Sequence, residues 1–156
     1  MHLPDDRAIV VCIGNELVAD DAAGYEVYRR LPPLPARLEY LGVGGFDLLP
    51  LLHGERHLIV VDAVQLGEAP GTVHVIPWQR LPEAGPEISV HGVGLRETIE
   101  IGKILFPEQM PEQVTLVGIE GRCFDRTREF MTGAVAGAID PALEAVRRLV
   151  QGGVHE

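Results

Sequence analysis

The sequence predicts a three-layer α/β/α domain, in which helices cover both faces of a twisted, mainly parallel five-stranded sheet with one antiparallel edge strand. Strand-like and helix-like segments alternate along the chain, as a parallel sheet with helical crossovers requires. Three strand-like segments are short, continuous and rich in β-branched residues, which is typical of strands covered on both faces. They span residues 8–13, 58–61 and 114–119.

Two further strands and four helices complete the expected order. Residues 37–43 alternate between polar and apolar side chains. Residues 72–76 follow the preceding strand after a link too short for a helical crossover, so we expect an antiparallel edge strand there. The expected helices span residues 22–31, 47–53, 95–106 and 132–150. Consecutive prolines at 32–33 end the first helix, and the Asp-Pro pair at 140–141 should kink or restart the last one.

Composition and charge favour one domain that does not bind nucleic acid. The 156 residues are enough for a single domain, which we expect to span residues 1–156. The formal net charge of -10 provides no basic patch for a phosphate backbone. Because no signal-peptide pattern and no apolar run of about 18 residues is found, we expect a cytoplasmic protein with no membrane insertion. The two cysteines form neither a disulfide framework nor a paired metal motif.

The most informative segment, residues 13–24, follows the first expected strand. In a dinucleotide-binding domain this turn is rich in glycine and holds a phosphate at a helix N-terminus. Here Asp20 and Asp21 occupy that place, where their charge opposes phosphate and where they are expected to cap the helix themselves. The segment therefore indicates a cation site. Gly14 and Gly24 are expected to allow close backbone packing.

Three residues are candidate metal ligands. Asp21 follows the first strand by a short loop, Asp62 ends the strand at 58–61, and His91 lies in a loop just before a helix. Ligands of α/β domains gather at the carboxyl ends of parallel strands, so these side chains are expected to converge. Two carboxylates and one imidazole suit Zn, Ni or Fe, with positions left open for water or substrate.

Each candidate also has an ordinary structural interpretation. Asp21 can be a helix cap, Asp62 can accept hydrogen bonds from the next loop, and His91 can be a solvated loop residue. For two other residues near the motif, a structural role is the favoured interpretation. Cys12 is expected to be a small core residue, and Glu16 a solvated surface carboxylate.

The motifs resemble those of the hydrogenase maturation endopeptidases, which trim the C-terminal extension from the nickel-loaded large subunit of nickel-iron hydrogenases. The family pattern of Gly-x-Gly-Asn, an acidic pair and a glycine is similar to Gly14-Asn15, Asp20-Asp21 and Gly24. The order and spacing of further motifs agree over nearly the whole chain. These motifs are the segments at 60–64, 70–72, 89–95 and 116–119.

The resemblance implies that Asp21, Asp62 and His91 are both the metal-contacting and the catalytic residues. It implies nickel that arrives with the hydrogenase large-subunit precursor, whereas Zn or Cd would occupy the same ligands in vitro. Only a loaded precursor would then present its scissile bond correctly. Hydrolysis would proceed through a metal-polarised water or carbonyl, with a carboxylate as proton acceptor.

Two other functions remain open at this point. A non-catalytic nickel-site chaperone for the same precursor would keep the ligands without cleaving a bond. A nucleotide-binding Rossmann-like domain would share the strand-turn-helix start, but the turn lacks the second and third glycines of that fingerprint and its acidic pair opposes phosphate.

Overall fold

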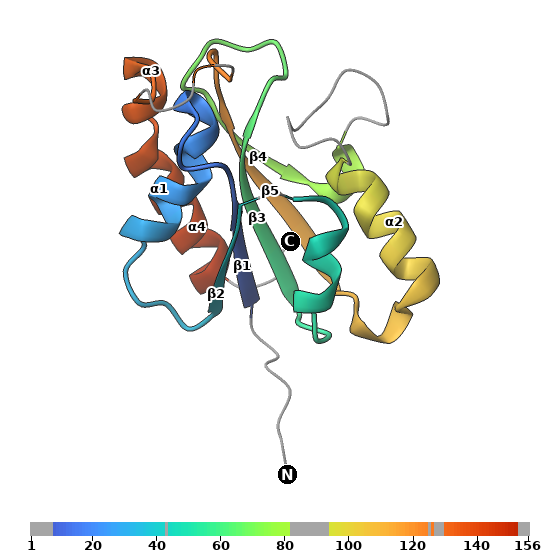
Figure 1. Ribbon diagram of the computed structural model, residues 1–156. Coiled ribbons are helices and arrows are strands. Elements are labelled where there is room, and N and C mark those ends of the chain that lie inside the picture. The colour runs from blue at the N-terminus through green and yellow to red at the C-terminus, as the bar shows by residue number, and fades with distance from the viewer. Residues whose placement is uncertain (1–7, 43, 82–93, 125, 127–129, 153–156) are drawn as a thin grey trace.

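The computed structural model describes residues 8–42, 44–81, 94–124, 126 and 130–152. Within these residues, five strands form one sheet in the order β2-β1-β3-β5-β4 (Figure 1). The first four strands in this order run parallel, and β4 pairs with β5 in the antiparallel direction at the edge. The strands are β1 (Ala8–Ile13), β2 (Arg37–Leu41), β3 (His57–Val64), β4 (Val73–Pro77) and β5 (Gln113–Glu120).

Helices cover both faces of the sheet, which confirms the expected three layers. The helices α1 (Ala23–Arg30) and α4 (Ile139–Gly152) lie on one face. The helix α2 (Leu95–Leu105) and the 3₁₀ segment η2 (Gly45–Leu51) lie on the other (Figure 1). None of the helices in the described ranges is both long and apolar enough to cross a bilayer.

The core follows from the alternation of side chains along the buried strands. All residues of β1 and β3 are buried, as expected for strands covered on both faces. Val10 of β1 and Ile59 of β3 pack under α1 and α4, whereas Val11 and Val60 face α2 and η2. Because these strands are parallel, their carboxyl ends meet at one end of the domain.

One helix expectation needs correction, and another is confirmed in more detail. The expected helix at 47–53 is the 3₁₀ segment η2, which contains Pro50. A proline inside the segment removes a backbone donor and disfavours a regular α-helix. The expected helix at 132–150 is two helices, α3 (Gly133–Ala136) and α4, which confirms the restart expected near the Asp-Pro pair and places it at Ile139. Pro141 then lies in the first turn of α4, where its missing N–H is tolerated.

Candidate functional site

The loop and turn after β1 pack closely against the end of that strand because two positions lack side chains. A Cβ atom at Gly14 would lie 2.3 Å from the carbonyl oxygen of Asp21, and one at Gly24 would lie 2.0 Å from that of Ile13. Both contacts are with backbone atoms, which cannot turn aside as a flexible side chain can. The expected role of these glycines is confirmed, and it brings the acidic pair to the carboxyl end of β1.

The acidic pair lies in the 3₁₀ turn η1 (Ala19–Ala22), which precedes α1. Ala19 has φ 24°, in the left-handed region, which costs a non-glycine residue about 1–3 kcal/mol. The N-cap positions of η1 and α1 are Val18 and Ala22, and neither makes a side-chain cap hydrogen bond. The expectation that Asp20 and Asp21 cap the helix is therefore wrong, because both residues lie inside the turn.

Asp20 is fully buried and joins η1 to the loop that follows β5. Its carboxylate accepts hydrogen bonds from the amides of Arg122 at 2.8 Å, Cys123 at 2.9 Å and Thr132 at 2.7 Å. The hydroxyl of Thr132 donates to the same carboxylate at 3.0 Å and 3.1 Å. Hydrogen bonds to an ionised group are about twice as strong as neutral ones. Asp20 therefore anchors a loop. Of the acidic pair, Asp21 is the residue that remains a candidate ligand.

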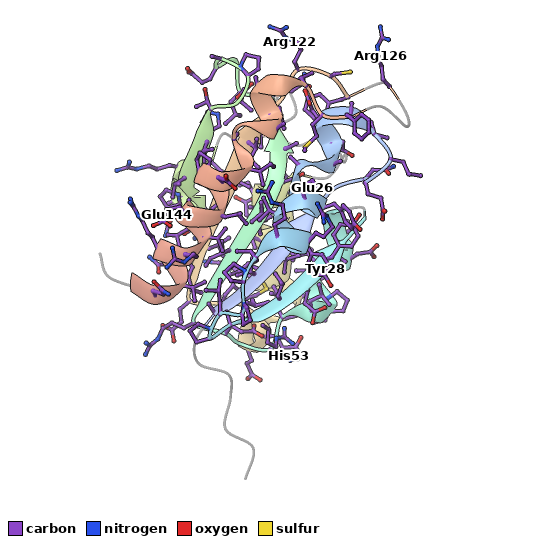
Figure 2. All side chains as sticks on the ribbon, turned by 90° about the vertical axis from the view of Figure 1, so that its left-hand side faces the viewer. Glu26, Tyr28, His53, Arg122, Arg126 and Glu144 are labelled. Carbon is purple, nitrogen blue, oxygen red and sulfur yellow. The ribbon has the colours of Figure 1, made fainter. Side chains whose placement is uncertain are left out.

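The loop that Asp20 anchors carries two exposed arginines. Arg122 and Arg126 project from the end of the domain where the parallel strands finish, whereas His53 lies at the opposite end (Figure 2). The anchored loop therefore borders the same end of the sheet as the acidic pair.

Asp21 fixes the short loop that leads into η1. It is 5% exposed, and its Oδ2 accepts a hydrogen bond from the amide of Asn15 at 3.1 Å. The side-chain oxygen of Asn15 in turn accepts one from the amide of Leu17 at 2.9 Å. The turn η1 also contacts β3, the strand that carries Asp62. The two candidate aspartates thus belong to neighbouring elements.

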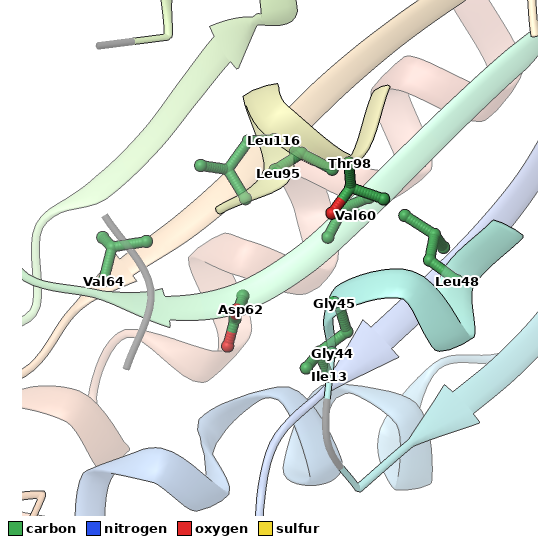
Figure 3. Close-up of a pocket in the computed structure, with 10 residues that line it drawn as sticks. All are labelled: Ile13, Gly44, Gly45, Leu48, Val60, Asp62, Val64, Leu95, Thr98 and Leu116. Atoms are coloured by element: carbon green, nitrogen blue, oxygen red, sulfur yellow. The ribbon is translucent and has the colours of Figure 1, made fainter. Parts of the chain in front are cut away.

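Asp62 lies inside β3, two residues before the strand ends. The expectation that it ends the strand is wrong because pairing with β5 continues past it, to Val64 opposite Glu120. Its buried carboxylate lines a cavity of about 20 Å³ whose other walls come from β1, β5, η2 and α2 (Figure 3). The polar side chains of this lining are Asp62 and Thr98. A cavity of this size has room for about one water molecule.

His91 lies outside the described residues. Gly94 is the N-cap of α2, and the next residue, Leu95, lines the Asp62 cavity. In the part of the chain that the structure describes, no three His, Cys, Asp or Glu side chains are grouped as a metal ion requires. The described members of the predicted ligand set, Asp21 and Asp62, are carboxylates, which suit hard and borderline cations.

The thiol of Cys12 is a core group. Cys12 is fully buried in β1. Burial raises the pKa of this thiol, and the charge of Asp62 raises it further. A thiol with a raised pKa stays neutral at neutral pH and is a poor nucleophile. The expected core role of Cys12 is therefore confirmed.

Glu16 is exposed, as expected for a surface carboxylate. Beside it, the hydroxyl of Tyr40 donates a hydrogen bond to the carbonyl of Gly14. Burial raises the pKa of Tyr40, and the charge of Glu16 adds to the effect. The rings of Tyr25 and Tyr28 pack on Tyr40 with centroids 5.3 Å and 5.4 Å away. Through Tyr40 of β2, this aromatic cluster contacts the loop after β1 at Gly14.

Comparison with known proteins decides the family. A family model described as hydrogenase maturation protease matches residues 38–149. The hydrogenase 2 maturation protease of Escherichia coli strain K12 is 32% identical over 147 residues, which cover 90% of this chain and 88% of that protein. The chain belongs to the hydrogenase maturation protease family.

Further similarities agree with this assignment. The hydrogenase expression/formation protein HupD of Rhodobacter capsulatus is 33% identical to this maturation protease over 158 residues, 96% of this chain and 74% of that protein. The solved structure of the hydrogenase maturating endopeptidase HybD from E. coli matches with a TM-score of 0.78 and 30% identity, covering 94% of this chain and 93% of that one. The maturation protease is accordingly an endopeptidase, a hydrolase of peptide bonds.

One buried acid at the same end of the sheet was not singled out from the sequence of this maturation protease. Glu120, the last residue of β5, accepts hydrogen bonds from the amides of Leu66 at 3.0 Å and Gly67 at 3.2 Å. Nε2 of His74 lies 2.9 Å from its Oε1. The rule that selected Asp62, an acid at the end of a buried strand, applies equally to Glu120. Glu120 holds the loop after β3, as Asp20 holds the loop after β5.

Proposed function

We propose that this maturation protease removes the C-terminal extension from the nickel-loaded large-subunit precursor of a nickel-iron hydrogenase. The observation that carries the proposal is the burial of Asp21 and Asp62 on neighbouring elements at the carboxyl end of the sheet. Two carboxylates are rarely buried this close to a strand end without a structural or chemical task. The names of the relatives, which refer to hydrogenase maturation, support the choice of substrate.

We further propose that Asp21, Asp62 and His91 contact the nickel of the precursor. Carboxylate and imidazole donors suit this ion. Three peptide units separate His91 from Gly94, and an extended chain spans at most about 11 Å over them. Gly94 adjoins the lining of the Asp62 cavity, and this short tether supports His91 as the third ligand. Nickel is part of the substrate here, so contact with it makes a folded, loaded surface a condition for cleavage.

The chemistry requires a proton acceptor as well as a position for the substrate. When water attacks the scissile carbonyl, a C–O bond forms and the C–N bond breaks, and a proton passes from the water to the leaving amine. Asp21 and Asp62 are the carboxylates of the proposed site, and either can take up that proton in transit. Neither cysteine is needed as a nucleophile in this scheme.

The test compares nickel-loaded with nickel-free precursor from the organism that carries this chain. We expect mass spectrometry to show loss of a C-terminal fragment from the loaded precursor alone. Cleavage of both forms at similar rates would contradict nickel recognition. Stable binding without a change of precursor mass would instead establish the non-catalytic chaperone.

A second test addresses the ligands without any precursor. We expect the isolated protein to bind Ni, Zn or Cd weakly, because three protein ligands leave the remaining positions to solvent. Acidification should weaken binding, since protons compete for the donors. Calorimetry with unchanged metal binding in Asp21→Ala, Asp62→Ala and His91→Ala would exclude this ligand set.

A further inference from the structure

An apolar groove of about 450 Å³ lies between η2 and the C-terminal half of α2. Phe46 of η2, Ile101 and Leu105 of α2 and the following residue Phe106 are among its lining residues. These side chains remain accessible, with Phe46 52% and Leu105 61% exposed. Ile104, which is 73% exposed, extends the apolar surface along the helix. A contiguous exposed apolar patch on a folded domain marks an interaction site.

The floor of this α2–η2 groove is closely packed. A Cβ atom at Gly102 would lie 2.5 Å from the sulfur of Met110 and 2.8 Å from a methyl carbon of Leu49. The glycine therefore lets η2 approach α2 closely beneath the groove. The exposed side chains above therefore stand on a closely packed base, and a preformed surface binds a partner at a lower entropic cost.

The groove continues the wall of the Asp62 cavity. The 3₁₀ segment η2 contributes Leu48 to the cavity and Phe46 to the groove. The helix α2 contributes Thr98 to the cavity and Leu105 to the groove. Leu105 lies seven positions after Thr98, which corresponds to about 10 Å along the helix axis. A protein that places its scissile bond near Asp62 can therefore reach the groove without leaving this face.

The charges around the groove indicate the character of its occupant. Asp47 and Glu108 are both exposed and are the sequence neighbours of the lining residues Phe46 and Gln109. The cations of α2 lie elsewhere, since Lys103 and Arg96 stand over the ring of Trp78, 4.4 Å and 5.5 Å from its centroid. The rim is therefore acidic and suits an apolar segment with basic neighbours. A second copy of this chain, with its net charge of -10, suits it poorly.

We propose that the α2–η2 groove binds an apolar segment with basic flanks on the hydrogenase large-subunit precursor. This inference rests on the proposed function, because the same protein must place its scissile bond at Asp21 and Asp62. The groove provides affinity for the folded precursor, whereas the carboxylates act on the bond that is cleaved. Substitutions in the groove should therefore change KM and leave kcat nearly unchanged.

The experiment measures processing kinetics with nickel-loaded precursor. The double variant Ile101→Ser/Leu105→Ser and the single variant Phe46→Ser change the groove from two separate elements. We expect each to raise KM by about tenfold or more and to keep kcat within about twofold. Val75→Ser is the matched control, because Val75 is 49% exposed on the edge strand β4, away from the groove. It should keep both constants within about twofold.

The rim provides a second readout. Asp47→Lys should raise KM, and added salt should raise the KM of the wild type more than that of this variant. Circular dichroism verifies that each variant is folded. Unchanged KM in Phe46→Ser and in the double variant would overturn the proposal. Sedimentation gives a second such outcome: if the wild type is a dimer and these variants are monomers, the groove is a dimer interface and the proposal is wrong.

The outcomes also separate this inference from the proposed function. If the wild type cleaves the precursor and the groove variants behave like Val75→Ser, the inference fails and the function stands. If the wild type cleaves nothing, the function fails, and calorimetric binding of the precursor then decides the inference. Loss of precursor binding in the groove variants, with binding kept in Val75→Ser, would support it in that case.

Discussion

The carboxylate of Asp20 accepts hydrogen bonds from both the amide and the hydroxyl of Thr132, 112 residues further along the chain. This relationship joins the first loop at the carboxyl end of the sheet to the last one. The two acids of the motif therefore differ in their contacts, since Asp20 holds the framework while Asp21 belongs to the proposed site.

The first prediction follows from this contact. Asp20→Asn replaces one carboxylate oxygen by an NH₂ group, which then faces backbone N–H donors and cannot accept their hydrogen bonds. The free energy of unfolding should therefore fall by about 2–4 kcal/mol. Thr132→Val should lower it by about 1 kcal/mol, because only the hydroxyl bond is lost. Urea unfolding measures both changes.

The matched control is Asp140→Asn. Asp140 also pairs across the chain, with Arg30 at 2.7 Å, but its side chain is 79% exposed. An exposed ion pair contributes little, so this variant should stay within about 0.5 kcal/mol of the wild type. If the Asp20 and Asp140 variants lose the same free energy of unfolding, the buried contact stabilises the fold no more than the exposed ion pair does.

The second prediction concerns the packing of α1 on β1. Gly24→Ala places a methyl group 2.0 Å from the carbonyl oxygen of Ile13, and α1 must shift to accommodate it. The free energy of unfolding should fall by about 1–3 kcal/mol or more. Gly133→Ala is the control, because nothing lies within 4 Å of its added Cβ. That variant should be neutral or slightly more stable, by at most about 1 kcal/mol, in thermal or urea unfolding.

The sheet could be predicted from the sequence because its central strands are buried on both faces. Such strands appear as continuous apolar runs, so the expected bounds 8–13 are those of β1. The short link before residues 72–76 also correctly indicated an antiparallel edge strand. The segment at 47–53 was harder to assign, since its apolar spacing is compatible with a helix and only Pro50 argues for the observed 3₁₀ geometry.

The geometry of the candidate site was predictable only in part. The rule for the carboxyl ends of parallel strands selected Asp21 and Asp62, and both are buried there. The task of Asp20 depends on a loop more than a hundred residues away, which no local pattern encodes. The position of Asp62 within β3 was missed because an aspartate interrupts the apolar run although pairing continues.

The third prediction is a pH dependence of stability at the amino end of β3. Burial lowers the pKa of His57 below 6.5, and its Nε2 lies 2.8 Å from Oγ1 of Thr115. The unfolded chain therefore takes up a proton more readily than the folded one. The stability that neutral His57 contributes is present above pH 6.5 and is lost as the pH falls through the folded pKa.

Urea unfolding at about pH 7.5 and about pH 5 measures this effect. His57→Gln cannot titrate, so its free energy of unfolding should fall less on acidification than that of the wild type. His53→Gln, at an exposed position, is the control and should keep the wild-type dependence. The interpretation is wrong if His57→Gln and the wild type lose the same stability.

The fourth prediction concerns the thiols. Cys12 is buried with a raised pKa, so iodoacetamide should modify Cys123 in the native protein and Cys12 only after unfolding. Cys123→Ser should process the precursor like the wild type, because the contacts of Cys123 with Asp20 come from its backbone. Mass mapping of the modified peptides and a processing assay check the two parts. An inactive but folded Cys123→Ser variant would point to covalent catalysis.

The final prediction separates the acids of the motif by their tasks. Asp21→Asn and Asp62→Asn keep the side-chain shape and remove the charge, so processing of nickel-loaded precursor should fall by at least about a hundredfold. Glu16→Gln should process nearly normally, because Glu16 is exposed and lies outside the proposed ligand set. Far-ultraviolet circular dichroism verifies the fold of each variant. An inactive Glu16→Gln variant together with an active Asp21→Asn variant would show that the essential carboxylate of the motif is Glu16.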